Sequence, residues 1–207
     1  VLLDALLAAA RPTWRGAAVQ ELVPDGTGWS LRDDEGAHWH ADAVILALPA
    51  PRLARLVAGI APRTAAAAAR IDTASSAVVA LAVPGGTPLP QQSGVLVASG
   101  ERLHAKAMTL STRKWGRRGN VELLRLSFGR LGDTIARDAG DDTLLAWSCE
   151  DLMTVFGVAV EPVDSRVHRW LHAMPQYGPG HAGLVAELRA GLPAGLAVAG
   201  SYLDGIG

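Results

Sequence analysis

The sequence predicts an α/β protein into which an α+β domain is inserted. Short apolar runs lie near the two ends, at 43–48 and 196–199, and continuous runs of this length are typical of strands buried on both faces of a sheet. Between them, at about 60–165, short strand patterns alternate with helical periods, as in antiparallel sheets packed on helices. The two ends are therefore expected to share one sheet, and the middle to form a domain carried on it.

The composition is that of a globular protein. The 207 residues are 49% hydrophobic and 19% charged, unlike disordered chains. A net charge of −1 gives no reason to expect nucleic acid binding. No apolar run reaches the roughly 18 residues of a membrane span, and no signal peptide pattern is present. The single Cys149 forms no intrachain disulfide. We expect a cytoplasmic protein that touches membranes only at their surface, and, from its starting and ending residues, a piece of a longer chain.

The first sixty residues predict a helix, a three-stranded meander, a buried strand and a further helix. Asp25-Gly26-Thr27-Gly28 is a strong hairpin signal, because its glycines accept the backbone of a tight turn. Pro49 ends the buried strand, since proline cannot donate to a ladder. In chain order we expect a helix at 1–10, strands at 17–23, 29–32, 38–41 and 43–48, and a helix at 51–60.

The rest of the chain predicts the inserted domain and a return to the first sheet. A helix is expected to begin at Asp141-Asp142-Thr143, since acidic residues are favoured at a helix N-terminus, and to end at Gly157. The remaining expected elements are helices at 63–70 and 181–191, strands at 75–83, 94–98, 105–111, 122–128, 165–171 and 196–199, and a basic loop at 113–120.

Gly200, Gly205 and Gly207 follow the last expected strand. Glycines there let the backbone approach a ligand, because no Cβ stands in the way. Cofactors of α/β proteins bind at the carboxyl ends of strands. A plain glycine-rich turn fits the same residues.

The sequence predicts neither a metal site nor a catalytic side chain. His38 and His40 lie on one face of a strand, but no third ligand is near them. Ser75-Ser76 is not part of a Gly-x-Ser-x-Gly turn. We therefore expect no catalytic acid, base or nucleophile in this chain.

Four segments in chain order resemble the C-terminal part of the flavin-dependent porphyrinogen oxidases of haem biosynthesis, a family with protoporphyrinogen and coproporphyrinogen III oxidases. Met174-Pro175-Gln176-Tyr177 is the most specific piece. The resemblance implies the FAD/NAD(P)-binding fold of the amine-oxidase type, incomplete at its N-terminus. The segments are 43–51, 111–115, 169–181 and 196–207.

This resemblance also implies a function and a domain plan. It implies oxidation of coproporphyrinogen III to coproporphyrin III, or of protoporphyrinogen IX to protoporphyrin IX, by FAD with molecular oxygen as acceptor. A further enzyme of the haem pathway is an expected partner. The implied domains are part of the FAD-binding domain at 1–58, a substrate-binding insert at 59–167, and a return to the FAD-binding domain at 168–207.

The resemblance implies two groups of binding residues. For the flavin, Val19 matches a contact of the adenine end, Ala47 a strand end, Trp170 an aromatic contact, and Gly205, Ile206 and Gly207 the loop at the ring. Ordinary core packing is the alternative for Val19 and Trp170. For the tetrapyrrole, the matching positions are Ser93, Gly94, Leu96, Thr109 and Ser127, with sheet core as the alternative. Arg113, Lys114, Arg117 and Arg118 could attract its carboxylates, although a solvated loop tip is the default interpretation of these residues.

One departure from the family keeps two other functions open. The family's Gly-x-Gly-x-x-Gly loop, which binds pyrophosphate directly after a strand, is expected to be absent from this chain. A flavin amine oxidase or carotenoid desaturase relative is one alternative, although amine oxidases usually carry Glu where Ser201 follows Gly200. An inactive fragment is the other.

Overall fold

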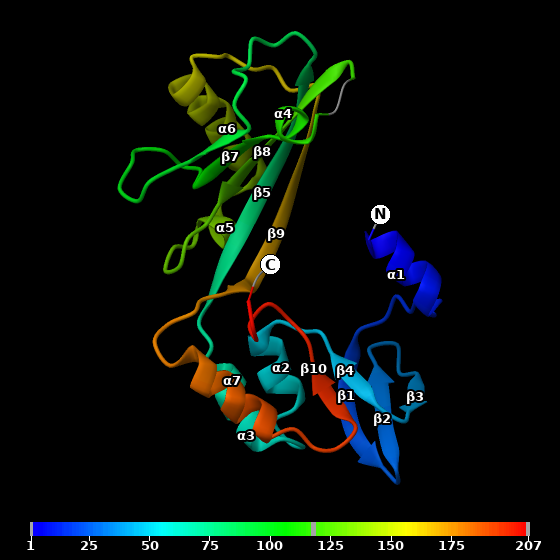
Figure 1. The fold of residues 1–207 in the computed structure, drawn as a ribbon. Helices are drawn as coiled ribbons and strands as arrows, with labels where there is room; N and C mark the ends of the chain where they lie inside the picture. Colours follow the sequence, from blue (N-terminus) through cyan, green and yellow to red (C-terminus); the bar gives the residue numbers. More distant parts are fainter. Residues whose placement is uncertain (1, 117–118, 206–207) are drawn as a thin grey trace.

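The computed structural model describes residues 2–116 and 119–205. This part of the chain builds two hydrophobic cores, one from both ends of the sequence and one from its middle. Figure 1 shows the two units one above the other, joined by the long strands β5 (Thr73–Pro84) and β9 (Asp164–Pro175). The predicted fold class, an α/β unit that carries an α+β insert, is confirmed.

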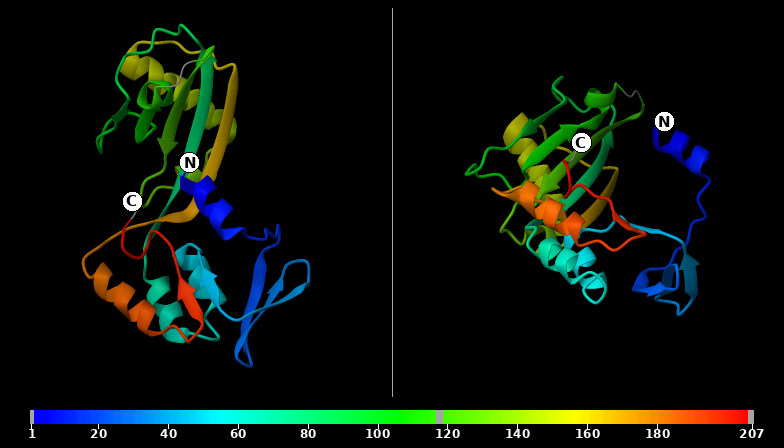
Figure 2. Two further views of the ribbon diagram at one scale, coloured as in Figure 1. Left: turned by 45° about the vertical axis from the view of Figure 1, so that its right-hand side comes forward. Right: turned by 60° about the horizontal axis from the view of Figure 1, so that its bottom comes forward.

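The first unit is built around a parallel pair of strands from the two ends of the sequence. Strand β10 pairs with β4, so that Leu196 lies opposite Val44 and Val198 opposite Leu46. Helices α3 and α7 pack side by side (Figure 2), where the hydroxyl of Thr64 donates to the carbonyl of Leu188 over 2.8 Å. The elements are α1 (Leu2–Ala10), β1 (Val19–Asp25), β2 (Gly28–Asp33), β3 (His38–Ala41), β4 (Val44–Leu46), α2 (Ala50–Leu56), α3 (Pro62–Ala69), α7 (His181–Ala190) and β10 (Leu196–Val198).

The prediction that the strand at 43–48 is buried on both faces is wrong. Ile45 is 70% exposed, whereas Leu46 and Leu196 are 6% exposed and pack with Leu53 in the first core. Within the described residues the helices cover one face of the β4–β10 pair, and the side chain of Ile45 points to the other. A continuous apolar pattern predicts a strand, but it does not show whether one face or both faces of that strand are covered by other elements.

The three-stranded meander is closed by one buried carboxylate. Asp33 accepts a hydrogen bond from the indole of Trp39 at 2.9 Å, and from the amides of Glu35 at 3.1 Å and Ala37 at 2.8 Å. The Trp39 bond first, and the two amides with it, hold the pKa of this carboxyl below its usual value against the opposing effect of burial. Asp33 therefore fixes the turn between β2 and β3 in its ionised form.

We expect the stability supplied by Asp33 to be lost in acid. Because the pKa is lower in the folded state, the contribution is present above the unfolded value of about 4 and is lost as the pH falls through the folded value. An Asp33→Asn variant should unfold at a lower urea concentration at pH 7 and show a flatter dependence on pH below about 4. The exposed Asp42→Asn is the control, and equal pH profiles for the two variants would contradict the assignment.

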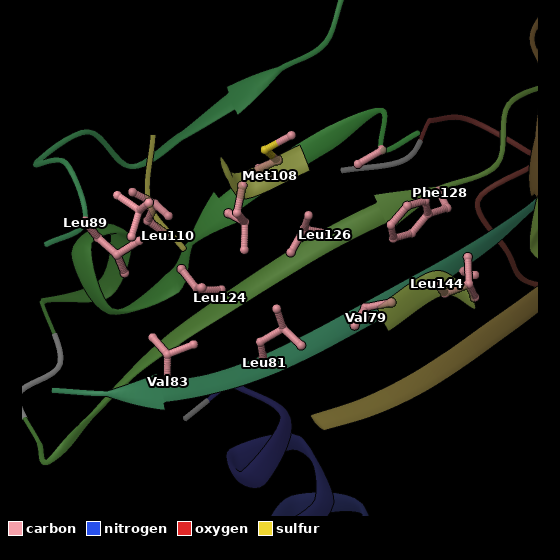
Figure 3. Close-up of a cluster of buried hydrophobic side chains, with 14 of the residues drawn as sticks. Val79, Leu81, Val83, Leu89, Met108, Leu110, Leu124, Leu126, Phe128 and Leu144 are labelled. Carbon is pink, nitrogen blue, oxygen red and sulfur yellow. The ribbon is translucent and has the colours of Figure 1, made fainter. Parts of the chain in front are cut away.

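The second unit is a five-stranded antiparallel sheet in the order β6-β7-β8-β5-β9. Its core lies on one face, where Val79, Leu81 and Leu126 of the sheet pack against Leu144 and Leu152 of α6; Figure 3 shows these strand side chains pointing to the same side. The remaining elements are β6 (Gly94–Leu96), β7 (Ala107–Leu110), α4 (Ser111–Trp115), β8 (Val121–Phe128), α5 (Ile135–Asp138) and α6 (Asp141–Phe156).

The opposite side of this sheet is here called the exposed face. Because side chains alternate along a strand, it carries the residues between those of the core. Within the described residues no helix is packed on it (Figure 1). Its members by register are Gly94, Leu96, Ala107, Thr109, Leu123, Arg125, Ser127, Ser76, Val78, Ala80, Ala82, Asp164, Arg166, His168 and Trp170.

The hairpin at 25–28 and the helix end at Gly157, which is left-handed with φ 68°, are confirmed. The structure differs from the sequence prediction in several elements. The helix expected at 51–60 ends at Leu56, and the strands expected at 43–48 and 94–98 are shorter, at Val44–Leu46 and Gly94–Leu96. The basic loop begins as the short helix α4, a helix at 135–138 was not predicted, and β9 continues four residues past Leu171. Short helices have too little periodicity to be recognised, and the pairing partner decides where a strand ends.

The domains at 1–58, 59–167 and 168–207 remain a prediction, and the residues of the two cores show where the chain passes from one unit to the other. The boundary at 58/59 lies before α3, whose Ala67 and Ala68 are buried in the first core. The boundary at 167/168 lies inside β9, which belongs to the sheet of the second unit. The change between the two units lies closer to Thr73 and Pro175, which pair at the ends of β5 and β9.

Candidate functional site

Two adjoining pockets lie where the parallel strands β4 and β10 end. In a parallel pair the carboxyl ends lie at the same edge, so the loops after both strands face the same space. Pocket 1, of about 230 Å³, is lined by the residues after β4 and after β10, by the start of β5 and by the end of β9, among them Ala47, Thr73, Pro175, Gly200 and Tyr202. Pocket 2, of about 690 Å³, continues along β4 toward the start of β1.

Two of the predicted flavin contacts lie together in these pockets. Val19, 41% exposed, lines pocket 2, and Ala47 lines both pockets. The other residues that line pocket 2 are mostly apolar and include the cationic Arg52 and Arg55. This combination suits an elongated ligand that has a flat apolar part and negative charge.

The other predicted flavin contacts lie elsewhere or outside the described residues. Trp170 does not line either pocket; it lies on β9, 43% exposed, with its ring edge against His168 at a centroid distance of 4.1 Å. Gly205, with φ 139°, is described, but no contact to the pockets is recorded for it. Ile206 and Gly207 lie outside the described residues.

Four of the five predicted tetrapyrrole contacts lie on the exposed face. Gly94 pairs with Thr109, and Leu96 pairs with Ala107, which in turn pairs with Ser127. Leu96 is 87% exposed, an unusual state for a leucine in a sheet. Ser93 precedes β6, and its carbonyl accepts the amide of Leu110. The register therefore brings these positions onto one surface, although their role stays a prediction.

Gly94 has a structural reason to be glycine. A Cβ at this position would lie 2.3 Å from the carbonyl oxygen of Met108 and 3.1 Å from the Cα of Thr109. Strands β6 and β7 approach more closely here than a side chain allows.

The predicted basic loop offers fewer free cations than its sequence suggests. Arg113 is paired with Glu122 at 2.7 Å, and the ammonium of Lys114 lies 5.3 Å from the ring centre of Trp115. Arg117 and Arg118 lie outside the described residues. Where an arginine is already paired, it attracts a ligand carboxylate only weakly.

The expectation that no Gly-x-Gly-x-x-Gly follows a strand is wrong as stated. Residues 178–183 have this spacing, after β9 and at the start of α7. However, β9 belongs to the antiparallel sheet and β10 pairs with β4 in another sheet, so the three elements do not form the parallel βαβ unit of a dinucleotide site. Pro179 also removes one of the backbone donors that such a loop needs.

Tyr202 is a residue of the pocket that the sequence analysis did not select. Its ring packs beneath Gly200, where a Cβ would lie 2.6 Å from it, and the residue is 2% exposed. Its hydroxyl is buried and has no hydrogen-bond partner among the described residues, and burial raises the pKa of this phenol to about 12. A tyrosine two residues after a strand-ending glycine was the available signal.

The two pockets meet part of the requirements of a flavin nucleotide. The wall of pocket 1 is made mostly from small residues, which allow a ring to approach the backbone, and it includes Tyr202, whose buried hydroxyl has no partner among the described residues. Pocket 2 adds apolar length and two cations. The residues present therefore fit part of such a group. No cluster of three metal-ligating side chains occurs in the part of the chain that the structure describes.

Comparison with known proteins agrees with this geometry. The chain is 70% identical over all its 207 residues to coproporphyrinogen III oxidase of Mycobacterium tuberculosis (strain ATCC 25618 / H37Rv) and covers 45% of that protein. It is 63% identical to coproporphyrinogen III oxidase of Mycobacterium leprae, of which it covers 46%. The chain thus spans less than half the length of these relatives, and the resemblance inferred from its four segments is confirmed.

Solved structures share the fold. A protein from Exiguobacterium sp. 255-15 that has been assigned as a protoporphyrinogen oxidase matches 99% of this chain with a TM-score of 0.82, at 22% identity and over 47% of its own length. A reduced UDP-galactopyranose mutase matches 84% of this chain with a TM-score of 0.66, at 16% identity and over 39% of its length. Residues 14–206 match the family model described as flavin containing amine oxidoreductase. The chain belongs to the family of flavin containing amine oxidoreductases.

Proposed function

We propose that the protein of which this chain is a part oxidises coproporphyrinogen III to coproporphyrin III, using FAD. The supporting observation is the identity of 63–70% with proteins named coproporphyrinogen III oxidase, which extends over every element described above. FAD is the cofactor supported by the family. Molecular oxygen as the acceptor, a haem-pathway enzyme as a partner, and a cytoplasmic location are parts of the same proposal. Among the described residues no helix has the length and apolar character to cross a bilayer.

In this proposal the chain binds and orients two flat molecules. Bound FAD supplies a two-electron acceptor. Pocket 1 and pocket 2 would hold part of it through small residues and backbone, with Val19, Ala47 and Tyr202 in the walls. The exposed face offers Leu96, Thr109 and Ser127 to the tetrapyrrole. Holding the two rings in contact and excluding water accounts for the rate without a side-chain acid or base.

The proposal is tested with the full-length protein. Purified protein with bound FAD should convert coproporphyrinogen III into a fluorescent porphyrin while it consumes oxygen, and should leave simple amines unchanged. Protoporphyrinogen IX in a parallel assay measures the preference between the two porphyrinogens. Turnover of an amine without turnover of either porphyrinogen would favour the amine oxidase alternative.

Ala47→Trp should greatly reduce the flavin content. The indole would occupy space that both pockets share, and a steric cost of about 1–3 kcal/mol corresponds to binding that is roughly fivefold to 150-fold weaker. The ratio of visible flavin absorbance to protein absorbance after purification measures the effect. Ala159→Trp, at an exposed position beyond α6, is the matched control and should keep full flavin content. Equal flavin contents in both variants would remove Ala47 from the site.

A further inference from the structure

The exposed face carries two arginines that the sequence analysis did not select. Arg125 of β8 and Arg166 of β9 both lie opposite Ala80 of the central strand β5, one on each side of it. Directly paired residues of an antiparallel sheet point to the same side. With strands about 4.8 Å apart, the two Cα atoms are separated by about 10 Å. The methyl group of Ala80 leaves the space between the guanidinium groups open.

Neither arginine is neutralised by the described residues. Both are exposed, and no hydrogen bond or ion pair is recorded for either side chain there. Two other arginines of this unit are paired within the protein: Arg113 with Glu122 and Arg169 with Asp141. Asp164 is the acid that shares this face; its carboxylate accepts the amide of Ser165 at 2.8 Å. Arg125 and Arg166 are therefore cations available to a ligand.

Their surroundings are those of a binding surface for an amphipathic anion. A hollow of about 310 Å³ is lined by Ala80, Ala82, Leu123, Arg125, Asp164 and Arg166, among others. Leu96 and Trp170 are exposed on the same face. Apolar walls with two separated guanidinium groups suit a flat apolar ring that carries carboxylate arms, because arginine binds carboxylates in a bidentate manner.

We propose that Arg125 and Arg166 form a carboxylate clamp for the arms of the tetrapyrrole. This proposal rests on the proposed function and names the groups that bind the acidic arms. Strands β5 and β9 lead from the clamp to pocket 1, where Thr73 and Pro175 are part of the wall, and Ala80 lies about 23 Å from Thr73 along β5. A ring lying over Ser127, which pairs with Val78, would be placed between pocket 1 and the clamp, with its arms on that side directed toward the two arginines.

The clamp is tested in the full-length protein with bound FAD, using Arg125→Gln, Arg166→Gln and the double variant. The probes are coproporphyrin III and its uncharged tetramethyl ester, with dissociation constants from fluorescence titration, and the KM for coproporphyrinogen III. Each substitution should weaken coproporphyrin III binding about tenfold and the double variant about a hundredfold, since each removes a charge-assisted hydrogen bond. Binding of the ester should change by less than about twofold, and kcat should change little.

The controls separate a clamp from a structural role. Arg102→Gln removes an exposed arginine from the loop on the α6 side and should bind both probes as the wild type does. Arg125→Lys and Arg166→Lys keep the charge and should recover part of the affinity. The clamp would be overturned if the double variant kept the wild-type ratio of affinities for coproporphyrin III and its ester. It would also be overturned if the affinities for both probes fell equally while the thermal midpoint of unfolding fell too, since that would indicate that the arginines pair within the protein. Wild-type protein that neither binds coproporphyrin III nor oxidises the porphyrinogen would refute the proposed function itself.

Discussion

Replacing Gly129 with alanine is expected to destabilise the protein by about 4 kcal/mol. Gly129 follows β8 with φ 89°, and a Cβ there would lie 2.5 Å from the carbonyl oxygen of Ser75 and 3.0 Å from the Cβ of Ala136. The left-handed backbone costs an alanine about 1–2 kcal/mol, and the overpacking about 1–3 kcal/mol more. Glycine at this point lets helix α5 and strand β5 approach each other.

Gly132 provides a matched control for the two contributions. It has nearly the same φ, 87°, but no atom within 4 Å of an added Cβ. Gly132→Ala should therefore cost only the backbone contribution, about 1–2 kcal/mol. Urea unfolding of both variants, followed by circular dichroism, measures the difference. If the two substitutions cost the same, the close contact at Gly129 contributes nothing to the stability of the second unit.

Replacing Asp151 with alanine is expected to cost about 4 kcal/mol as well. Asp151 of α6 is 2% exposed, and its carboxylate accepts the amide of Ala105 at 2.7 Å and that of His104 at 3.0 Å, while the His104 ring nitrogen lies 3.2 Å away. Trp147, one turn earlier, stacks on the His104 ring at 4.5 Å. Alanine would leave two amides without an acceptor in a largely buried place, at about 1–3 kcal/mol each.

Two further variants test this explanation. Asp151→Asn keeps one acceptor oxygen and should cost less than half as much as the alanine. Glu150→Ala removes an exposed acid from the adjacent position of the same helix and should change the unfolding free energy by less than about 0.5 kcal/mol. Hydrogen exchange of the Ala105 amide should accelerate in the alanine variant alone. Unchanged exchange there would show that water replaces the carboxylate at no cost.

Local chemistry made most of the elements predictable. Gly26 and Thr27 form the two-residue turn between the paired Asp25 and Gly28, and the glycine supplies the left-handed backbone that such a turn needs. Gly157 ends α6 for the same local reason. The family could also be predicted from the sequence, because motifs such as Met174-Pro175-Gln176-Tyr177 depend only on the order of the residues. Val19 and Ala47 could be assigned to a common site only through that resemblance, because 28 residues separate them in the sequence.

Other features depended on partners distant in the chain. The adjacent positive charges at 113–118 suggested a site for the carboxylates of the ligand, but Arg113 is paired with Glu122. Arg125 and Arg166 are isolated in the sequence, and the pairing of β5 with both β8 and β9 brings them to one face. The exposure of Ile45 also depends on distant partners, because the residue pattern of a strand does not show which of its faces packs against helices.

The sequence by itself determined the hairpin turn at 25–28, the end of α6 at Gly157, the order of the two units and the family, because these depend on neighbouring residues or on residue order. Only the tertiary structure decided which face of each sheet is open, which cations remain unpaired and that Tyr202 has a buried hydroxyl beside pocket 1. Those properties follow from strand register and burial, which are set by contacts between residues far apart in the chain.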